Sequence, residues 1–484
     1  MQNTEDKIKK RALFWFKNDL RLEDNVALQN ALSKYDSVAC IYVFEKDFLR
    51  TLKKRDLTMD FLYKAVSNLK NELRSLGSDL IIKLGDHTID IPAVAKKFEV
   101  DAVLTNKSYL PTEVLKEDLI EKKLFFDDIK FFSFKDNVIF SPEDLLDNNG
   151  DYFTDFAKYR EVWNSTIKNE DIKPVFITNK NKLSKFKSND MPKLEQFGFV
   201  TSNLSEKMKV SPAGAWDQFV KFKDKTKKYI SVKEIVHYSG VSYMSIYLRF
   251  GLISVRTMLS ALALLMKELP KEERENVKYW IDQLIRREFN TQYYYYNANL
   301  LIEPEKIYYL KLNWENDMKK FNLWCEGNTG YPIIDAAMRA LKETGYMHFR
   351  LRQLTATFLT KVLFIDYRYG EAYFSSMLLD YDKVSNNVGW QWAASVSNDS
   401  NEYIKMFNPS ENSKRFDANA HFIKKYIPEL TKVPSKYLHE PWLYQEELKK
   451  NGVILGETYP NKMVDYKERR NYVLQQYEEV NKLK

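Results

Sequence analysis

The chain has 484 residues, of which 44% are hydrophobic, 29% charged and 14% aromatic. This length and composition exclude a disordered or fibrous protein, and they allow two or three domains with a sizeable core. The net charge of +8 permits nucleic-acid binding, but it is modest for this length and also fits an ordinary lysine-rich surface.

The two cysteines, Cys40 and Cys325, lie far apart in the sequence, so neither a disulfide framework nor zinc-ligand spacing is present. The five histidines also lack metal-ligand spacing, and we predict no metal site. The longest apolar run, residues 258–266, is too short to cross a bilayer. The polar N-terminus contains no signal core. We expect a cytoplasmic protein, nuclear if the source is a eukaryote, with no membrane partner.

Residues 10–136 alternate short β-branched or aromatic runs with helical patterns. The predicted strands are residues 12–16, 38–44, 80–83, 102–104 and 130–134. A helical pattern over residues 59–76 stops before Gly77, which is typical of a C-terminal cap. Strands that alternate with helices predict a doubly wound parallel sheet. No G-x-G-x-x-G follows the first strand, so the usual dinucleotide fingerprint is absent.

Residues 137–210 are turn-rich and basic, and we predict a long surface connector with short helices around residues 153–163. Ser211 followed by Pro212 is typical of a helix start. From there the pattern is helical, so residues 211–484 are predicted to form an all-helical domain. The charged stretch that begins at Tyr466 predicts an amphipathic surface helix.

Several long stretches carry a resemblance to a known family. Residues 11–28 contain RALFWFKNDLRLEDNVAL, residues 330–341 GYPIIDAAMRAL, residues 344–352 TGYMHFRLR, and residues 386–395 NNVGWQWAAS, followed by FNP at residues 407–409. By these stretches the chain resembles the photolyase and cryptochrome family, and most of all the class I cyclobutane-dimer photolyases. The resemblance covers nearly the whole chain. It implies an α/β antenna domain at 10–136 and a helical FAD-binding domain at 211–484.

The resemblance implies a set of residues that contact FAD. They are Tyr229, Ser242, Tyr243, Met244, Ser245, Trp280, Arg287, Arg352, Asp380, Asp382 and Asn386. Hydroxyl and backbone N–H groups at a helix start suit phosphate, although Val241 replaces the threonine that the family usually has. Serine-rich turns also open ordinary helices, and Arg352 with Asp380 could form a purely structural bridge. The matching stretches favour the flavin interpretation, in which the amide of Asn386 faces flavin N5.

The resemblance also implies residues that take part in the photochemistry. They are Trp390, Tyr367, Asn386 and Gln283. Trp390 matches the flavin-proximal member of the family's electron relay, and Tyr367 stands where the family has the middle tryptophan. The third position falls near Pro304, with Tyr308 and Tyr309 close by. Tyrosine is harder to oxidise unless its proton leaves too, and core packing explains Tyr367 equally well.

A further set of positions matches residues that contact DNA or the lesion. They are Lys233, Gln283, Arg286, Phe349, Arg350, Trp392, Lys405 and Asn412. Four pocket positions depart from class I: Gln283 replaces a glutamate, Arg286 a tryptophan, Phe349 an asparagine and Gln353 a methionine. The charged triplet at residues 286–288 is instead similar to class II photolyases, although a solvated charged turn is the plainer interpretation.

The function that the resemblance implies is that of a deoxyribodipyrimidine photolyase acting on DNA with UV photoproducts. Excited reduced FAD gives an electron to a pyrimidine dimer, the ring splits, and the electron returns. The alternative is a cryptochrome with the same flavin and no repair. The altered pocket favours the cryptochrome, whereas Trp392, the basic balance and the lack of a long C-terminal extension favour repair.

A second antenna chromophore, a folate or a deazaflavin, is compatible with the resemblance. Asn106 and Lys107 lie near one family contact region, but the residues that follow depart from the pattern, so this cofactor is not assigned. We expect the protein to act as a monomer.

Overall fold

The computed structural model describes residues 9–204, 208–237, 240–398 and 404–482. Its internal contacts divide the chain into two compact units. Unit 1 comprises Met1–Lys227 and Tyr243–Ala298, and unit 2 comprises Lys228–Ser242 and Asn299–Lys484. Each unit is therefore built from two stretches that are separated in the sequence.

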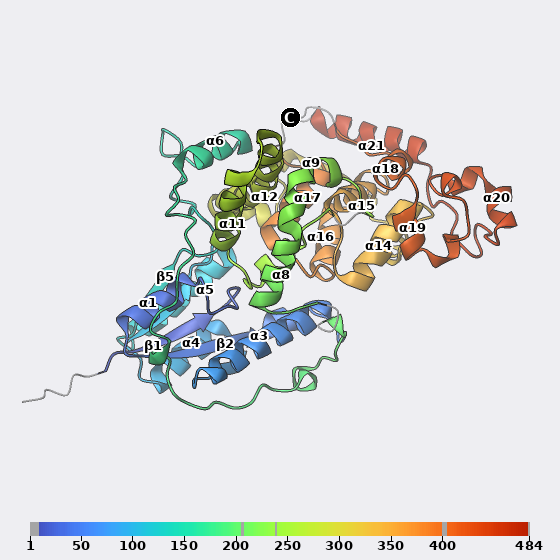
Figure 1. Ribbon diagram of the computed structural model, residues 1–484. Coiled ribbons are helices and arrows are strands. Elements are labelled where there is room, and N and C mark those ends of the chain that lie inside the picture. The colour runs from blue at the N-terminus through green and yellow to red at the C-terminus, as the bar shows by residue number, and fades with distance from the viewer. Residues whose placement is uncertain (1–8, 205–207, 238–239, 399–403, 483–484) are drawn as a thin grey trace, which may run out of the picture. The chain divides into compact units, whose positions relative to one another are not determined.

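Unit 1 contains a five-stranded parallel sheet (Figure 1). Its strands are β1 (Arg11–Phe16), β2 (Ser37–Glu45), β3 (Leu80–Gly85), β4 (Ala102–Asn106) and β5 (Lys130–Phe134). The strand order is β3-β2-β1-β4-β5, so the winding reverses between β1 and β4, as in doubly wound folds. All five predicted strands are present, and the predicted fold class is confirmed.

Ten helices are described in unit 1. They are α1 (Val26–Lys34), α2 (Lys46–Arg50), α3 (Leu57–Ser75), α4 (His87–Lys97), α5 (Pro111–Phe125), α6 (Phe156–Thr166), α8 (Pro212–Lys223), α10 (Met244–Arg249), α11 (Val255–Glu268) and α12 (Lys271–Tyr296). Local capping explains several of their ends. Gly77 follows α3 with a left-handed backbone of φ +77°. The Ser211 hydroxyl accepts a hydrogen bond from the Gly214 N–H at the start of α8, so this predicted helix start is confirmed.

The central strands β1, β2 and β4 are buried on both faces, which explains why they are nearly continuous hydrophobic runs, whereas the edge strand β5 is largely exposed. Trp15 of β1 lies in a core cluster with Ile91 of α4 and Ile120 of α5. Its neighbour Phe14, whose side chain alternates to the opposite face, is also fully buried. Helices α1 and α3 pack on the strands as well.

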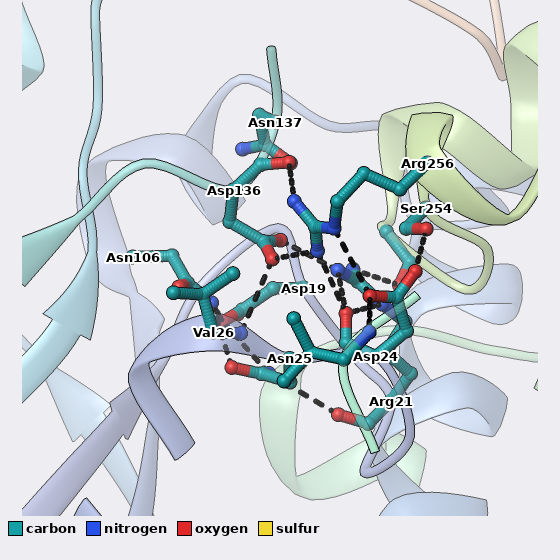
Figure 2. Close-up of polar contacts among 12 residues, drawn as sticks. Asp19, Arg21, Asp24, Asn25, Val26, Asn106, Asp136, Asn137, Ser254 and Arg256 are labelled. Carbon is teal, nitrogen blue, oxygen red and sulfur yellow. Dashed lines mark hydrogen bonds and ion pairs between the residues drawn. The ribbon is translucent and has the colours of Figure 1, made fainter. Parts of the chain in front are cut away.

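A buried ionic network joins three parts of unit 1 (Figure 2). Asp136, just before the connector, accepts hydrogen bonds from Arg21 at 2.5 Å and from Arg256 of α11 at 2.6 Å. Arg256 also donates to Asp24 at 3.0 Å, and Ser254 donates to the same carboxylate. Burial opposes ionisation, yet the charges of Arg21 and Arg256 hold the pKa of Asp136 below its ordinary value. The network therefore stabilises the attachment of α11 to the turn after β1.

Asn106, at the end of β4, is part of the adjoining polar cluster (Figure 2). Its side-chain nitrogen donates to Asp19 at 2.6 Å and to Asn25 at 2.9 Å, and its oxygen accepts from the Ala27 N–H at 3.1 Å. The Lys107 ammonium lies 3.3 Å from Glu143. The polar groups of Asn106 are thus used within the fold, and the antenna cofactor stays unassigned.

Unit 2 is helical. Its helices are α9 (Tyr229–Val232), α13 (Met318–Glu326), α14 (Pro332–Thr344), α15 (Phe349–Lys361), α16 (Tyr367–Ser375), α17 (Lys383–Ala393), α18 (Pro409–Phe416), α19 (His421–Tyr426), α20 (Gln445–Lys450) and α21 (Tyr466–Asn481). They surround a large core that includes Trp324 and Trp390. The predicted C-terminal helix is present as α21. It is more than a surface helix, because Tyr477 is fully buried and its hydroxyl donates to the Ala394 carbonyl at 2.5 Å.

The connector contains α6, whose first turn is capped by Asp155, and two short 3-10 helices, Lys180–Lys182 and Leu194–Phe197; its other described residues are mostly irregular backbone. The domain boundaries expected after residues 136 and 210 stay predictions, because the compact units are divided at other positions. Within the described ranges, no helix has the length and apolar character needed to cross a bilayer. In the same part of the chain, no three His, Cys, Asp or Glu side chains are grouped as metal ligands.

Candidate functional site

The predicted site residues belong to both units. Unit 1 contains Tyr243, Met244, Ser245, Trp280, Gln283, Arg286 and Arg287. Unit 2 contains Tyr229, Lys233, Ser242, Phe349, Arg350, Arg352, Tyr367, Asp380, Asp382, Asn386, Trp390, Trp392, Lys405 and Asn412.

In unit 1, α12 carries four of the predicted residues. Trp280 is buried and packs on α8, with its ring centroid 5.3 Å from that of Phe222. Arg287 is half-buried and donates to the Asn137 carbonyl at 2.8 Å. Both predicted flavin residues therefore also hold α12 against neighbouring segments.

The two predicted lesion-contacting residues on α12, Gln283 and Arg286, are exposed. The Gln283 amide donates to the Tyr279 carbonyl at 3.2 Å, one turn back on the same helix. The Arg286 guanidinium lies 3.7 Å from the centroid of the Phe156 ring, a close cation–π contact. Phe156 begins α6, so Arg286 has a packing partner that the sequence did not indicate.

Glu288, next in the triplet, is buried and accepts hydrogen bonds from the connector. Its two oxygens receive the Ile139 N–H at 2.7 Å, the Phe140 N–H at 2.9 Å and the Trp163 indole N–H at 2.8 Å. Burial raises the pKa of Glu288 to about 7, although these donors favour the anion. The glutamate of the charged triplet is thus a structural acceptor and not a solvated group.

We expect this carboxyl group to make the stability of the chain depend on pH. Because its folded pKa is raised, the folded state keeps the proton longer than the unfolded state. The resulting stabilisation is complete below the ordinary glutamate pKa and disappears as pH rises to about 7. Glu288→Gln removes this titration. The difference in unfolding free energy between parent and variant should therefore change by roughly 3 kcal/mol between pH 4 and pH 7.5. A pH-independent difference in urea titrations would contradict this assignment.

In unit 2, Arg352 and Asp380 form the predicted pair. One guanidinium nitrogen of Arg352 lies 2.9 and 2.8 Å from the two carboxylate oxygens of Asp380. The Arg352 Nε donates to the Met347 carbonyl at 2.7 Å, which fixes the plane of the guanidinium. The pair is therefore a rigid combination of one cation and one largely buried carboxylate.

The start of α17 presents the remaining predicted polar groups of this region. Asp382 caps the helix, because its carboxylate accepts the Ser385 N–H at 2.8 Å. Asn386 is half-buried, and its amide donates to the Glu371 carbonyl at 3.3 Å. Residues 352–386 of unit 2 thus contain one guanidinium, two carboxylates and one amide among the predicted site residues. Together these groups can both donate and accept hydrogen bonds.

Trp390 of α17 is buried among rings. Its ring centroid lies 5.0 Å from that of Phe374 and 6.2 Å from that of Trp324. The ring also lies directly against the backbone of α16, because a Cβ at Gly370 would come within 2.1 Å of it. Trp324 is therefore an aromatic neighbour of Trp390 that the sequence did not indicate.

The other residues predicted for the electron relay, Tyr367 and the tyrosines at 308 and 309, have different neighbours from Trp390. Tyr367 is buried at the start of α16, and burial raises its pKa. Tyr309 packs between Tyr308 and Tyr477, with ring centroids 4.5 and 5.5 Å away, and its hydroxyl donates to Asn481. Their part in a relay stays a prediction.

Two of the predicted DNA residues meet around one carboxylate, in what we call the Glu234 cluster: Glu234, Lys233, Arg350 and Arg415. Arg350 donates to one oxygen of Glu234, and Arg415 donates to the other at 2.6 Å. The Lys233 ammonium lies 3.6 Å from the first oxygen. Burial opposes ionisation, but Arg350 and then Arg415 hold the pKa of Glu234 below its ordinary value.

The remaining predicted contacts are less concentrated. Trp392 is half-buried, and its ring centroid lies 6.1 Å from that of Phe407. Lys405 is exposed, and its carbonyl accepts from Lys361 at 2.8 Å. The Asn412 amide donates to the carbonyl of Asn408, the residue that caps the start of α18.

The predicted phosphate-binding residues lie at two helix starts. Tyr229 is buried at the start of α9. Ser242 is half-buried, and Tyr243 caps α10 with a left-handed backbone of φ 58°. Ser245 is exposed and Met244 is buried.

A cavity of about 1120 Å³ lies within unit 1, between α6 and the pair α11 and α12. Leu259, Met266 and Ile281 supply apolar lining, and Arg160 pairs with Asp282 at 2.9 Å. None of the predicted site residues lines this cavity, so it is separate from the candidate site.

Sequence reasoning missed Glu234, Arg415 and Trp324. Glu234 is 181 positions from Arg415, and no local pattern distinguishes either from ordinary surface charges. Trp324 is 66 positions from Trp390, and no local pattern in the sequence pairs the two rings.

Two family models match the chain. Residues 12–176 match the model described as DNA photolyase, and residues 280–479 match the model described as the FAD binding domain of DNA photolyase. A deoxyribodipyrimidine photo-lyase of Vibrio cholerae is 32% identical over 479 residues, covering 96% of this chain and 98% of the relative.

Solved structures are similar over the same extent. A bacterial class III photolyase from Agrobacterium tumefaciens matches with a TM-score of 0.89 and 27% identity, covering 100% of both chains. A cryptochrome of Synechocystis matches with a TM-score of 0.86 and 26% identity, covering 96% of this chain and 99% of that one.

Proposed function

Because this chain belongs to the DNA photolyase family, we propose that it is a light-driven photolyase that splits pyrimidine dimers in DNA with non-covalently bound FAD. The observation that carries the proposal is the match to a deoxyribodipyrimidine photo-lyase over almost the whole of both chains. It is supported by the family model for the FAD-binding domain, which spans Arg352, Asp380, Asn386 and Trp390.

The side chains present fit the chemistry of a flavin. The edge of an isoalloxazine ring offers both donors and acceptors, and unit 2 supplies a guanidinium, carboxylates and an amide in Arg352, Asp380, Asp382 and Asn386. We propose that these residues hold the ring. For the phosphates and ribose we propose Tyr229 and residues 242–245, and Trp280 and Arg287 as further contacts. When bound, reduced FAD supplies the light-driven electron that opens the dimer.

The chain's own groups orient the DNA. We propose that Lys233 and Arg350 bind backbone phosphates, with Lys405 and Asn412 as further DNA contacts. Trp392 supplies a ring on which an extruded base can stack. The Gln283 amide can still hydrogen-bond the carbonyl edge of a pyrimidine, and the Arg286 guanidinium can stack or bind phosphate. We propose that the protein acts as a monomer.

The second candidate is a cryptochrome that retains the flavin and repairs nothing. The observation that favours it is the altered pocket: Gln283, Arg286, Phe349 and Gln353 all depart from class I. Two of these side chains also have protein partners, since Arg286 packs on Phe156 and Gln353 accepts from Arg350 at 2.9 Å. Similarity to the Synechocystis cryptochrome is compatible with this alternative.

One experiment separates the two functions. The purified protein with fully reduced FAD is mixed with an oligonucleotide that contains one cyclobutane thymine dimer, and intact thymines are measured after blue light or in the dark. We expect repair in the light and none in the dark. The substitution Gln283→Glu with Arg286→Trp should change the repair yield while the flavin absorbance stays the same.

The possible failures have different meanings. If the protein binds FAD but repairs no pyrimidine photoproduct in the light, the photolyase proposal is refuted and the cryptochrome proposal takes its place. A folded protein that is colourless and does not take up added FAD would refute both candidates.

A further inference from the structure

The Glu234 cluster places one carboxylate among three cations, of which Arg415 is exposed, Arg350 is half-buried and Lys233 is buried. Glu234 follows α9, Arg350 lies on α15 and Arg415 is near the end of α18. Both arginines donate to opposite oxygens of the same carboxylate, and Lys233 lies 3.6 Å from it. Three cations and one anion leave a net charge of +2.

Aromatic rings support the same cations. The Arg350 guanidinium carbon lies 4.9 Å from the centroid of Phe349, and the Arg415 guanidinium carbon lies 5.5 Å from that of Phe416. The Lys233 ammonium lies 5.8 Å from the Phe349 ring. These contacts limit the positions that the three cations can adopt.

Without a carboxylate among them, the cations would repel one another. Like charges a few ångströms apart disfavour each other, and long side chains relieve this by extending into solvent in different directions. A carboxylate that accepts from two guanidinium groups removes the repulsion and fixes their orientation. The Arg415 side chain remains 65% exposed, so it can contact a ligand while it is held.

We propose that Glu234 is a positioning residue for DNA binding, which holds Arg350, Arg415 and Lys233 together as one binding site for backbone phosphates. This inference rests on the proposed photolyase function. It assigns a role to two residues that the sequence did not single out, Glu234 and Arg415.

A purely structural role for Glu234 is the alternative, because Glu234 attaches residues 228–237 to the rest of unit 2. That stretch has other attachments, however. The Val236 N–H donates to the Phe416 carbonyl at 3.3 Å, and His237 lies 3.4 Å from Asp417. Without Glu234, these attachments would remain, whereas Arg415 would lose its ion pair and Arg350 would keep its hydrogen bond to Gln353.

The test uses the sign of the change. Glu234→Gln removes one negative charge and so raises the net charge by one. Simple electrostatic attraction to DNA then predicts tighter binding, whereas loss of positioning predicts weaker binding. The matched control is Glu411→Gln on α18, which adds the same charge at a residue that is 65% exposed and pairs only with Lys414 among the described ion pairs. Affinity for an oligonucleotide with one thymine dimer is measured from 50 to 200 mM NaCl for the FAD-loaded full chain.

We expect Glu234→Gln to bind about tenfold more weakly than the parent, equivalent to about 1.4 kcal/mol, with a salt slope lower by roughly one. Glu411→Gln should bind as tightly as the parent or more tightly. Glu234→Asp, which keeps the charge, should recover part of the loss. Flavin absorbance and thermal midpoint establish that each variant is folded.

The outcomes are distinguishable. If the parent binds dimer-containing DNA and Glu234→Gln binds as tightly as Glu411→Gln, the positioning role is refuted and the photolyase function stands. If the parent does not bind such DNA, the proposed function fails and this inference with it. Should Glu234→Gln fail to fold, Arg415→Gln replaces it, and unchanged affinity and salt slope in that variant would equally overturn the proposal.

Discussion

Asp136→Ala is expected to lower the free energy of unfolding by about 3–5 kcal/mol. Asp136 is fully buried and is the acceptor for both Arg21 and Arg256. Removal of the Asp136 carboxylate leaves the buried guanidinium groups of Arg21 and Arg256 without the anion that they share. The cost of an uncompensated buried charge exceeds what the intact network contributes, so the effect is large. Urea unfolding followed by far-UV circular dichroism measures it.

An exposed ion pair provides the control. Asp47 pairs with Arg50 at 2.9 Å, and both side chains are mostly in solvent. Asp47→Ala should therefore change the stability by less than about 1 kcal/mol. Equal effects of the two substitutions would show that the buried network does not hold unit 1 together.

Trp390→Phe is expected to slow light-driven reduction of bound FAD at least about tenfold, the change that 1.4 kcal/mol in a barrier produces. Phenylalanine keeps an aromatic ring beside Phe374 but lacks the outer indole atoms that lie against Gly370, and it is much harder to oxidise than an indole. The measurement is the rate at which oxidised-flavin absorbance disappears under blue light with a thiol reductant present. Repair by chemically reduced protein should be affected far less, since the electron then starts on the flavin.

Two further substitutions identify the next donor. Tyr367→Phe tests the residue that the sequence favours, and Trp324→Phe tests the ring that lies 6.2 Å from Trp390. Slowed reduction in one variant and not in the other assigns the route. If Trp390→Phe itself reduces the flavin at the parental rate, Trp390 is not the proximal donor.

The fold could be predicted well because its signals are local. Each strand of the sheet is a short hydrophobic run between turns, and the Ser211 cap depends on a hydrogen bond to a residue three positions away. The family resemblance also located Arg352 and Asp380, which the structure brings into contact across 28 positions.

The partners of the site residues could not be predicted in the same way. Arg286 packs on Phe156, Arg350 donates to Glu234, and Glu288 accepts from the connector, and each of these contacts joins distant parts of the sequence. A single sequence contains no periodicity that reports such pairs. The expected domain boundaries differ from the compact units for a related reason: Arg256 ties α11 to the unit that contains the sheet, through contacts that only the folded chain reveals.

The same network has a consequence for the order of events on the ribosome. Asp24 and Asp136 leave the exit tunnel before Arg256, which follows Asp136 by about 120 residues, or roughly 6–24 s at ordinary rates of synthesis. During that interval Asp136 already has Arg21 as an ion-pair partner, but neither Asp24 nor Asp136 yet has its ion pair with Arg256. We therefore expect chains released before residue 256 to be more sensitive to protease than the finished protein, with protection appearing only once α11 has emerged.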